Sequence, residues 1–253
     1  MKIYEITFSP TGGTKKVVDS LANELGRDIT SVDLSDSNED LHEFSLKNED
    51  IAIIAVPSYS GRVPATAAER ISRIQGNGAK AIIVCVYGNR AYEDTLVELQ
   101  DIVQKNGFSV VAAVAAIAEH SIAHKYAKDR PDKDDNRLLK EFAAKINEKL
   151  KKKDFSTPEI PGNRPYRKAG NAGIVPKPTK ACTQCGLCAS RCPVGAIDKN
   201  NPAKVNRKAC ISCMRCVSVC PHQARKINGL LLAIVNMMLK KACSIRKECE
   251  LYI

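Results

Sequence analysis

Residues 182–193 read CTQCGLCASRCP, and residues 210–221 read CISCMRCVSVCP. In both stretches two, two and three residues separate successive cysteines, and a proline follows the fourth cysteine directly. The second stretch begins 28 residues after the first, and a lysine and an alanine precede each of them. They hold eight of the eleven cysteines, and such clusters in a chain without secretory features are more often metal ligands than disulfides. The sequence therefore predicts a duplicated metal-binding segment.

The spacing favours iron–sulfur clusters over zinc ions. Structural zinc sites commonly combine two Cys-x₂-Cys pairs into one set of four ligands. Here each run has three closely spaced cysteines and a fourth that is followed by proline, which is the bacterial 4Fe–4S spacing. Residues 179–226 thus resemble a two-cluster bacterial ferredoxin, and we expect a small α+β domain of that type.

This resemblance implies the ligands of each cluster, because in two-cluster ferredoxins the fourth cysteine of a run binds the other cluster. The first cluster would be held by Cys182, Cys185, Cys188 and Cys220. The second cluster would be held by Cys210, Cys213, Cys216 and Cys192.

Composition and charge set further limits. With 253 residues, of which 44 % are hydrophobic, the chain can bury one large core or two modest ones, which excludes a disordered or collagen-like protein. The longest nearly apolar run, residues 230–239, is too short for a membrane span, which needs about 20 residues. The early charge of Glu5 argues against a secretory signal. We therefore expect a cytoplasmic protein without a membrane span.

Residues 151–253 carry 20 Lys and Arg against 5 Asp and Glu, whereas residues 1–150 have a formal net charge of −4. A basic half is also typical of proteins that bind nucleic acid. No helix-turn-helix, zinc finger or RNA-binding motif accompanies it, so we expect no nucleic-acid partner. Two oxidised clusters with their thiolates would contribute a formal charge of about −4, which would offset part of the positive charge of this half.

The first 150 residues alternate apolar runs with amphipathic segments. Runs rich in Ile, Val and Ala indicate strands buried on both faces, and they cover residues 2–8, 29–34, 51–56, 81–87 and 110–117. Helical periodicity follows at residues 14–25, 95–104 and 136–150, with Asn136 as the expected cap of the last helix. The alternation predicts an α/β fold with a doubly wound, five-stranded parallel sheet over residues 1–152.

The first strand leads directly into SPTGGT, residues 9–14, and then into a helix. A strand–loop–helix turn presents backbone N–H groups and a helix N-terminus to a phosphate. The motif is neither a Walker loop nor a G-x-G-x-x-G turn. It resembles the phosphate loop of flavodoxins, which binds FMN. The residues that this resemblance assigns to FMN are Ser9, Thr11, Gly12, Gly13 and Thr14.

Two later loops, residues 57–64 and 87–94, follow the third and fourth expected strands. They look like the flavodoxin loops that flank the isoalloxazine ring. The resemblance implies that Tyr59 stacks on the ring, with Tyr87 or Tyr92 as second candidates, and that Gly61 and Gly88 contact it through the backbone. Tyrosines that merely cap the loops are the alternative.

Several other residues have open roles. Arg62 either points inward and stabilises a reduced anionic flavin or lies exposed, and His120 is either a proton donor or a locally hydrogen-bonded loop residue. His42 and His222 are expected at the surface. Cys85 lies in the middle of an expected strand, where we expect it to be a small buried hydrophobic residue.

The remaining segments connect and extend the two halves. Residues 153–178 are rich in proline and glycine and read as a linker. Residues 227–253 form an expected helical tail whose apolar residues pack against a domain or against a second subunit in a homodimer. Its cysteines, Cys243 and Cys249, lack a ligand set and are expected to be free thiols.

Together the halves resemble the flavodoxin–ferredoxin fusion proteins of anaerobic bacteria and archaea, although tryptophan, a common stacking residue of flavodoxins, is absent. The resemblance implies an oxidoreductase that passes electrons between two 4Fe–4S clusters and FMN and reduces a small acceptor such as a quinone. Because no NAD(P) fingerprint is present, we expect a redox protein as the outside partner. A pure protein-to-protein electron carrier and a scaffold that binds no flavin remain alternatives.

Overall fold

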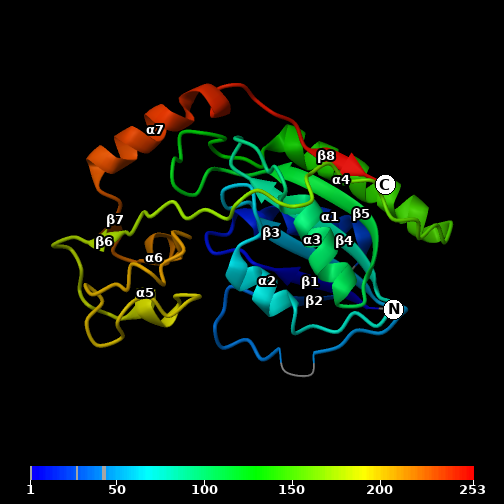
Figure 1. Ribbon diagram of the computed structural model, residues 1–253, viewed down its shortest axis with the longest axis horizontal. Helices are drawn as coiled ribbons and strands as arrows, with labels where there is room; N and C mark the ends of the chain where they lie inside the picture. Colours follow the sequence, from blue (N-terminus) through cyan, green and yellow to red (C-terminus); the bar gives the residue numbers. More distant parts are fainter. Residues whose placement is uncertain (1, 27, 42–43) are drawn as a thin grey trace.

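The computed structural model describes residues 2–26, 28–41 and 44–253, so that His42 lies outside the described residues. A larger α/β part and a smaller part with short helices and strands lie side by side in Figure 1. Helix α7 (Gly229–Cys243) runs from the smaller part back to the larger one.

The larger part is built on a sheet whose strand order defines its fold. Five strands are parallel and lie in the order β2-β1-β3-β4-β5. Their bounds are β1 (Ile3–Thr7), β2 (Ile29–Asp33), β3 (Ile51–Pro57), β4 (Lys80–Tyr87) and β5 (Ser109–Ile117). This order is that of the flavodoxin-like doubly wound fold. The predicted α/β fold is therefore confirmed.

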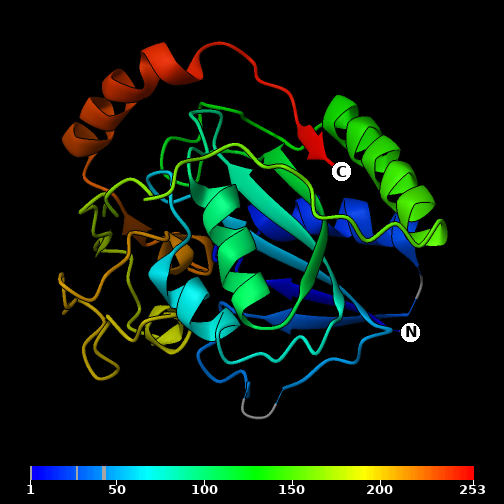
Figure 2. The ribbon, with the colours of Figure 1, turned by 45° about the vertical axis from the view of Figure 1, so that its right-hand side comes forward.

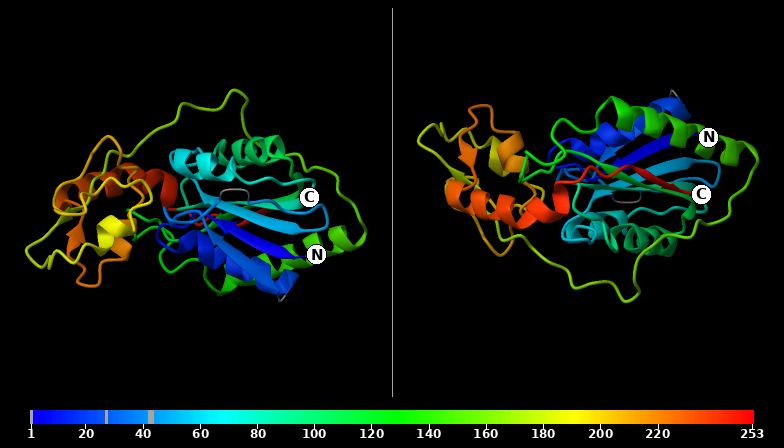
Figure 3. Two further views of the ribbon diagram at one scale, coloured as in Figure 1. Left: turned by 90° about the horizontal axis from the view of Figure 1, so that it is seen from below. Right: turned by 90° about the horizontal axis from the view of Figure 1, so that it is seen from above.

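Helices cover both faces of the sheet. Figure 3 shows the sheet between one pair, α1 (Gly13–Leu25) and α4 (Lys133–Lys151), and a second pair, α2 (Ala65–Ile71) and α3 (Thr95–Lys105). Because both faces are covered, the central strands β3, β4 and β5 are apolar and buried along almost their whole length. Helix α2, of seven residues, is absent from the sequence-based assignment because its apolar period is too short to detect.

Helix α4 begins earlier than the sequence predicts. Its cap is Asp132, whose side chain accepts bonds from the backbone N–H groups of Asp134 and Asp135. The Asp135 carboxylate in turn accepts the N–H of Asp132 at 2.9 Å, which completes a capping box. The prediction of Asn136 as the cap is wrong: Asn136 lies inside the helix and its side chain accepts a bond from Ser20 Oγ at 2.7 Å.

The smaller part repeats its backbone conformation as well as its cysteines. Helices α5 (Leu187–Ser190) and α6 (Arg215–Ser218) occupy equivalent places in the two runs, and β6 (Lys177–Pro178) pairs antiparallel with β7 (Arg225–Lys226). Positive φ angles recur at three equivalent pairs, which are Gln184 and Ser212, Gly186 and Met214, and Gly195 and Gln223. Such left-handed residues curl the backbone into a concavity of the kind that surrounds many iron–sulfur sites.

The linker is fastened to the larger part along α3, as Figure 2 lets the reader follow. The Asp94 carboxylate accepts the backbone N–H of Asn163 at 2.9 Å and that of Arg167 at 2.7 Å. Arg164 forms an ion pair with Asp101, which projects from α3. The linker is thus held in place over much of its length, although it contains no helix in the described chain.

The C-terminal tail continues beyond its helix. Residues 250–252 form β8 (Glu250–Tyr252), which pairs antiparallel with β5 and adds a sixth strand to the sheet. The buried Asn89 side chain holds the preceding segment, since its amide donates to the carbonyl oxygens of Cys243 and Ile245, both at 2.8 Å. No helix in the described part of the chain has the length and apolar character that a membrane crossing requires.

Candidate redox site

A large cavity of about 480 Å³ lies at the carboxyl end of the sheet, beside the smaller part. The loops that follow β1, β3, β4 and β5 line it, and linker residues between 170 and 174, the second cysteine run and α7 line its other sides. Open α/β sheets bind ligands in this position, outside the carboxyl ends of the strands where the strand order reverses. Helix α7 and both domains therefore meet at one potential binding site.

Six of the residues that the sequence assigns to FMN line this large cavity. They are Thr11, Gly13, Thr14, Tyr59, Tyr87 and Gly88. The other four belong to the same loops but lie behind the cavity lining, and they are Ser9, Gly12, Gly61 and Tyr92.

The loop after β1 is shaped to bind an anion. Ser9 Oγ accepts the backbone N–H of Lys15 at 2.9 Å, which closes the loop onto the start of α1. Gly12, at φ +88°, is the N-cap and has no side chain to offer, so Ser9 occupies the Lys15 N–H but the N-cap itself makes no side-chain bond. The first N–H groups of a helix, here those of Gly13 and Thr14, have no intrahelical partner and are available to a phosphate.

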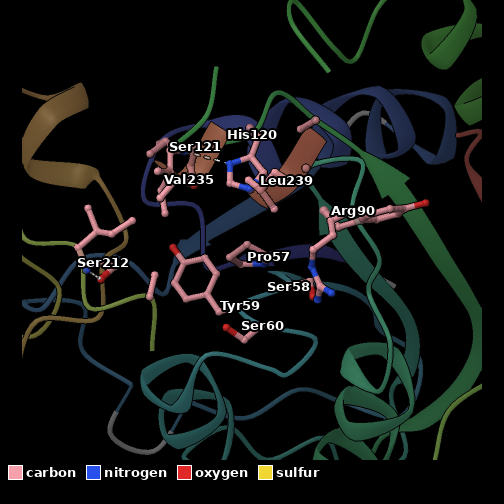
Figure 4. A pocket seen from close by; sticks show the side chains of 18 of the residues that line it. Pro57, Ser58, Tyr59, Ser60, Arg90, His120, Ser121, Ser212, Val235 and Leu239 are labelled. Carbon is pink, nitrogen blue, oxygen red and sulfur yellow. Dashed lines mark hydrogen bonds between the residues drawn. The ribbon is translucent and has the colours of Figure 1, made fainter. Parts of the chain in front are cut away.

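The loop after β3 forms a tight turn. Tyr59 and Arg62 exchange two backbone hydrogen bonds, of 3.0 and 3.1 Å, across Ser60 and Gly61, which both have positive φ. A Cβ atom on Gly61 would lie 2.8 Å from the Cβ of Glu93, and φ here is +77°, so this position favours glycine. The turn projects the Tyr59 ring into the large cavity, where Figure 4 shows it between Ser212 and Arg90.

The other two tyrosines are held by their neighbours. The Tyr87 ring is buried and lies 5.3 Å, centroid to centroid, from that of Tyr92. The Tyr92 hydroxyl donates to Glu250 at 2.7 Å and lies 2.8 Å from the Tyr252 hydroxyl. Tyr92 therefore fastens β8 to the loop after β4, and Tyr87 is the one that reaches the cavity.

Arg62 points away from the cavity. Its guanidinium donates two bonds of 2.7 Å to the Glu98 carboxylate and lies over the ring of Tyr166. The hypothesis that Arg62 faces the flavin is thus wrong, because a carboxylate on α3 pairs with it. The arginine that lines the cavity is Arg90, which forms a two-bond ion pair with Glu93.

His120 lines the cavity in its neutral form. Its Nδ1 accepts the backbone N–H groups of Ile122 at 3.2 Å and Ala123 at 3.1 Å, so the ring proton resides on Nε2. Burial lowers the pKa of His120 to about 4. The ring packs over Gly88, where a Cβ atom would lie 2.6 Å from His120 Cδ2. Figure 4 shows the imidazole above the Tyr59 ring.

Helix α7 contributes an apolar wall. The residues involved are Leu231, Ile234, Val235, Met238 and Leu239. The helix is seated on the larger part, where Val235 and Leu239 pack against Ala123 and Tyr126. Ile234 and Met238 remain 42 % and 73 % exposed, so the cavity is open to solvent on this side.

Two smaller cavities lie among the cysteines of the smaller part. Four thiols line the first cysteine cavity, which are Cys182, Cys185, Cys188 and Cys220. Four others line the second cysteine cavity, which are Cys192, Cys210, Cys213 and Cys216. All eight are free cysteines. Among the described residues, no group of three or more His, Cys, Asp or Glu side chains is arranged to hold a single metal ion.

The surroundings of these thiols suit iron–sulfur clusters. Backbone N–H groups point at the fourth cysteine of each run, since the N–H groups of residues 196 and 224 lie 3.3 Å from the Cys192 and Cys220 sulfurs. Hydrogen bonds to sulfur are one means by which proteins set cluster potentials.

The three cavities form a row with shared walls. Ile211 and Ser212 line both the large cavity and the second cysteine cavity. Arg225 lines both cysteine cavities.

Polar contacts join the smaller part to the carboxyl end of the sheet. Arg191 pairs with Asp36 at 3.2 Å and Arg215 with Asp33 at 3.4 Å. Arg70 donates to the carbonyl oxygen of Pro193 at 2.8 Å. Arg191 and Pro193 belong to the first cysteine run and Arg215 to the second, so both runs are held against the larger part.

Sequence reasoning did not include the cavity residues of the linker, the second cysteine run and α7. The apolar residues of α7 could have been noticed, because a ferredoxin domain does not need this additional apolar segment. The surface that α7 packs against, however, depends on tertiary structure. Arg90 and Ser212 gave no signal, since each looks like an ordinary loop residue.

Comparisons with known proteins find one matching family model and several similar solved structures. The family of the 4Fe-4S dicluster domain matches residues 181–225. Solved structures similar to the chain include oxidised flavodoxin 1 from Bacillus cereus, at 20 % identity and a TM-score of 0.44, over 58 % of this chain and 98 % of that one. A flavodoxin from the domain Archaea has 16 % identity and a TM-score of 0.41, over 60 % of this chain and 99 % of that one.

The rubredoxin oxygen:oxidoreductase of Desulfovibrio gigas has 16 % identity and a TM-score of 0.43, over 60 % of this chain but only 36 % of that one. No curated protein sequence matches the chain. The flavodoxin-like fold itself is defined by the strand order given above. The chain joins a flavodoxin-like domain to an iron–sulfur domain of the 4Fe-4S dicluster type. That combination is the organisation of an electron-transfer protein.

Proposed function

We propose that this protein is an iron–sulfur flavoprotein that passes electrons between two 4Fe–4S clusters and FMN. The observation that carries the proposal is the row of three cavities with shared walls. The first and second cysteine cavities would each hold one cluster, and the large cavity would hold the flavin. Only two residues of chain, Ile211 and Ser212, line both the second cysteine cavity and the large one in the described structure.

The residues of the large cavity fit FMN from phosphate to ring. The N–H groups of Gly13 and Thr14 and the hydroxyl of Thr11 would bind the phosphate, while Tyr59 would contact the ring. A bound FMN accepts electrons singly from clusters and releases them singly or in pairs. The loop after β1 and the Tyr59 turn would thus orient the cofactor beside the second cysteine cavity.

We further propose that the electron pair reduces a small organic acceptor such as a quinone. The apolar wall of α7 suits a flat, weakly polar molecule, and His120 would donate its Nε2 proton as a hydrogen bond to a carbonyl oxygen. The quinone takes up two electrons and two protons to become a hydroquinone. A reduced redox protein supplies the electrons, and water supplies the protons.

Cofactor content tests the main proposal. Protein purified without oxygen should contain about eight iron atoms and one FMN per chain. Rapid mixing with a one-electron reductant should then show the cluster absorbance bleaching before the flavin absorbance. Zinc in place of iron, or iron-loaded protein that binds no added FMN, would overturn it.

Turnover tests the acceptor. Reduced protein should transfer electrons to a soluble quinone faster than free FMN of equal concentration does. His120→Ala should slow this transfer while FMN content stays constant. Reduction of a partner protein without quinone turnover would instead identify a pure electron carrier.

A further inference from the structure

Arg225 occupies a singular position among the described residues, since it alone lines both cysteine cavities. It is the first residue of β7, which pairs with β6 beside the short helices α5 and α6 in Figure 1. Its side chain is almost fully buried, with 2 % of its surface exposed. A charged group in such a place is costly unless other groups compensate its charge.

Arg225 bonds to a cysteine of the first set and lines the cavity of the second. Nη1 lies 3.3 Å from the sulfur of Cys188, which lines the first cysteine cavity. The same side chain lines the second cysteine cavity together with Cys216. The carbonyl oxygens of Pro202 and Pro176 accept further bonds, at 2.8 and 3.3 Å.

Nothing else in the described structure balances this charge. The hydrogen-bond partners of Arg225 are two carbonyl oxygens and the Cys188 sulfur, and its Nε atom is buried without a hydrogen-bond partner. No carboxylate of the described residues pairs with it at ion-pair distance. The negative charge that would compensate a guanidinium here must therefore come from the contents of the two cavities.

The internal repeat shows that the arginine is not required by the loop itself. The equivalent residue of the first run is Ile197, which is buried as well and lines the second cysteine cavity alone. Both follow an alanine whose N–H donates to the fourth cysteine of its run. The duplicated segment thus breaks its symmetry at this pair, and the charge lies in the wall that the two cavities share.

We propose that Arg225 is a positioning residue that sets the reduction potentials of both clusters together, by a hydrogen bond to a ligand of the first and by its charge in the wall of the second. This inference rests on the proposed function. Reduction adds one negative charge to a cluster, and a buried guanidinium bonded to its thiolates stabilises that charge. One arginine placed between two clusters raises both potentials in the same direction.

The test measures the midpoint potential of each cluster in the full-length, iron-loaded protein, by electron paramagnetic resonance during an anaerobic redox titration. Arg225→Gln should shift the reduction equilibrium of both clusters at least tenfold toward the oxidised form, which corresponds to about 59 mV for a one-electron couple. The potential of bound FMN should stay nearly constant in the same titration. Arg207→Gln removes the same formal charge from an exposed position of the same domain and should shift neither cluster comparably.

Clusters with wild-type potentials in Arg225→Gln would overturn the inference and leave the arginine a structural role. A shift of one cluster alone would overturn the claim that it serves both. If Arg225→Gln fails to assemble clusters, Arg225→Lys decides, because an ammonium keeps the charge in the wall of the second cavity but cannot reproduce the guanidinium bond to Cys188. We then expect the two potentials to separate, and unchanged potentials would overturn the inference. A wild-type protein without clusters would instead overturn the proposed function.

Discussion

Replacing Asn89 should release the C-terminal tail from the larger domain. Its buried side chain donates to the carbonyl oxygens of Cys243 and Ile245 at 2.8 Å and accepts the N–H of Lys247 at 3.1 Å. These three bonds fix the segment between α7 and β8 on the loop that follows β4. The residue has a φ of 64°, which is a left-handed conformation that asparagine and glycine tolerate better than other residues.

The size of the effect follows from these contacts. A hydrogen bond contributes a net of about 1 kcal/mol, so Asn89→Gly should destabilise the docked tail by about 3 kcal/mol while it still accommodates the backbone angle. Since about 1.4 kcal/mol is a factor of ten, the open form of the tail should become about 100-fold more populated. Asn89→Ala should cost about 1 kcal/mol more, because alanine disfavours a positive φ.

Hydrogen exchange measured by mass spectrometry reports this opening directly, because locally unfolded segments exchange faster than the rest of a protein. Peptides from residues 229–253 should lose protection in Asn89→Gly, while peptides from β3 keep theirs. Asn38→Gly provides the control, since Asn38 is exposed and bonds within its own loop. Unchanged protection of the tail, within a factor of three, would refute the claim that Asn89 holds it.

Three further outcomes are expected. Asp135→Asn should lower the free energy of unfolding by about 3 kcal/mol in a urea titration, because it leaves a buried arginine without its carboxylate, whereas the exposed Asp134→Asn should change it little. Burial alone would raise the pKa of Asp94, but the hydrogen bonds it accepts from the linker outweigh burial and lower it. The contribution of Asp94 to stability is therefore complete above the unfolded pKa of about 3.9 and is lost as the pH falls through the folded pKa. The Tm of Asp94→Asn should therefore fall less between pH 5 and pH 2 than the Tm of the parent protein. Parallel curves of Tm against pH would contradict this. Thr11→Ala and Gly12→Ala should weaken FMN binding about tenfold or more, measured by quenching of FMN fluorescence, with iron content unchanged; a parallel loss of iron would count against separate sites.

The parts of the fold that sequence predicts are those with a strong local signal. The five parallel strands are runs of Ile, Val and Ala bounded by polar residues, and their assigned ends agree with the structure to within one residue. Strand β8 has no such run, because its three residues pair at the sheet edge only after α7 has carried the chain there. Its position depends on tertiary structure, and local pattern cannot reveal it.

The site divides in the same way. Regular cysteine spacing points to two ligand sets, and each set of four lines one cavity. The turn around Gly61 shows why a motif residue need not touch a ligand: it permits the conformation that projects Tyr59. The orientation of Arg62 depends on its ion pair with Glu98, which lies 36 positions later in the chain on α3. A local sequence pattern cannot identify such a partner.

The attachment of the smaller part through the linker and the tail matters more for electron transfer than the net charge of that part does. A flexible tether would give the two domains an effective concentration in the millimolar range and would leave each transfer to a new encounter. Here the linker is bonded along α3 and the tail ends as a strand of the sheet, so the smaller domain is fastened at both of its ends. The ion pairs of Arg191 and Arg215 at the contact are partly exposed and contribute about 1 kcal/mol or less each. The opposite net charges of the two halves are therefore a minor factor, and the two covalent straps keep the second cysteine cavity against the large one.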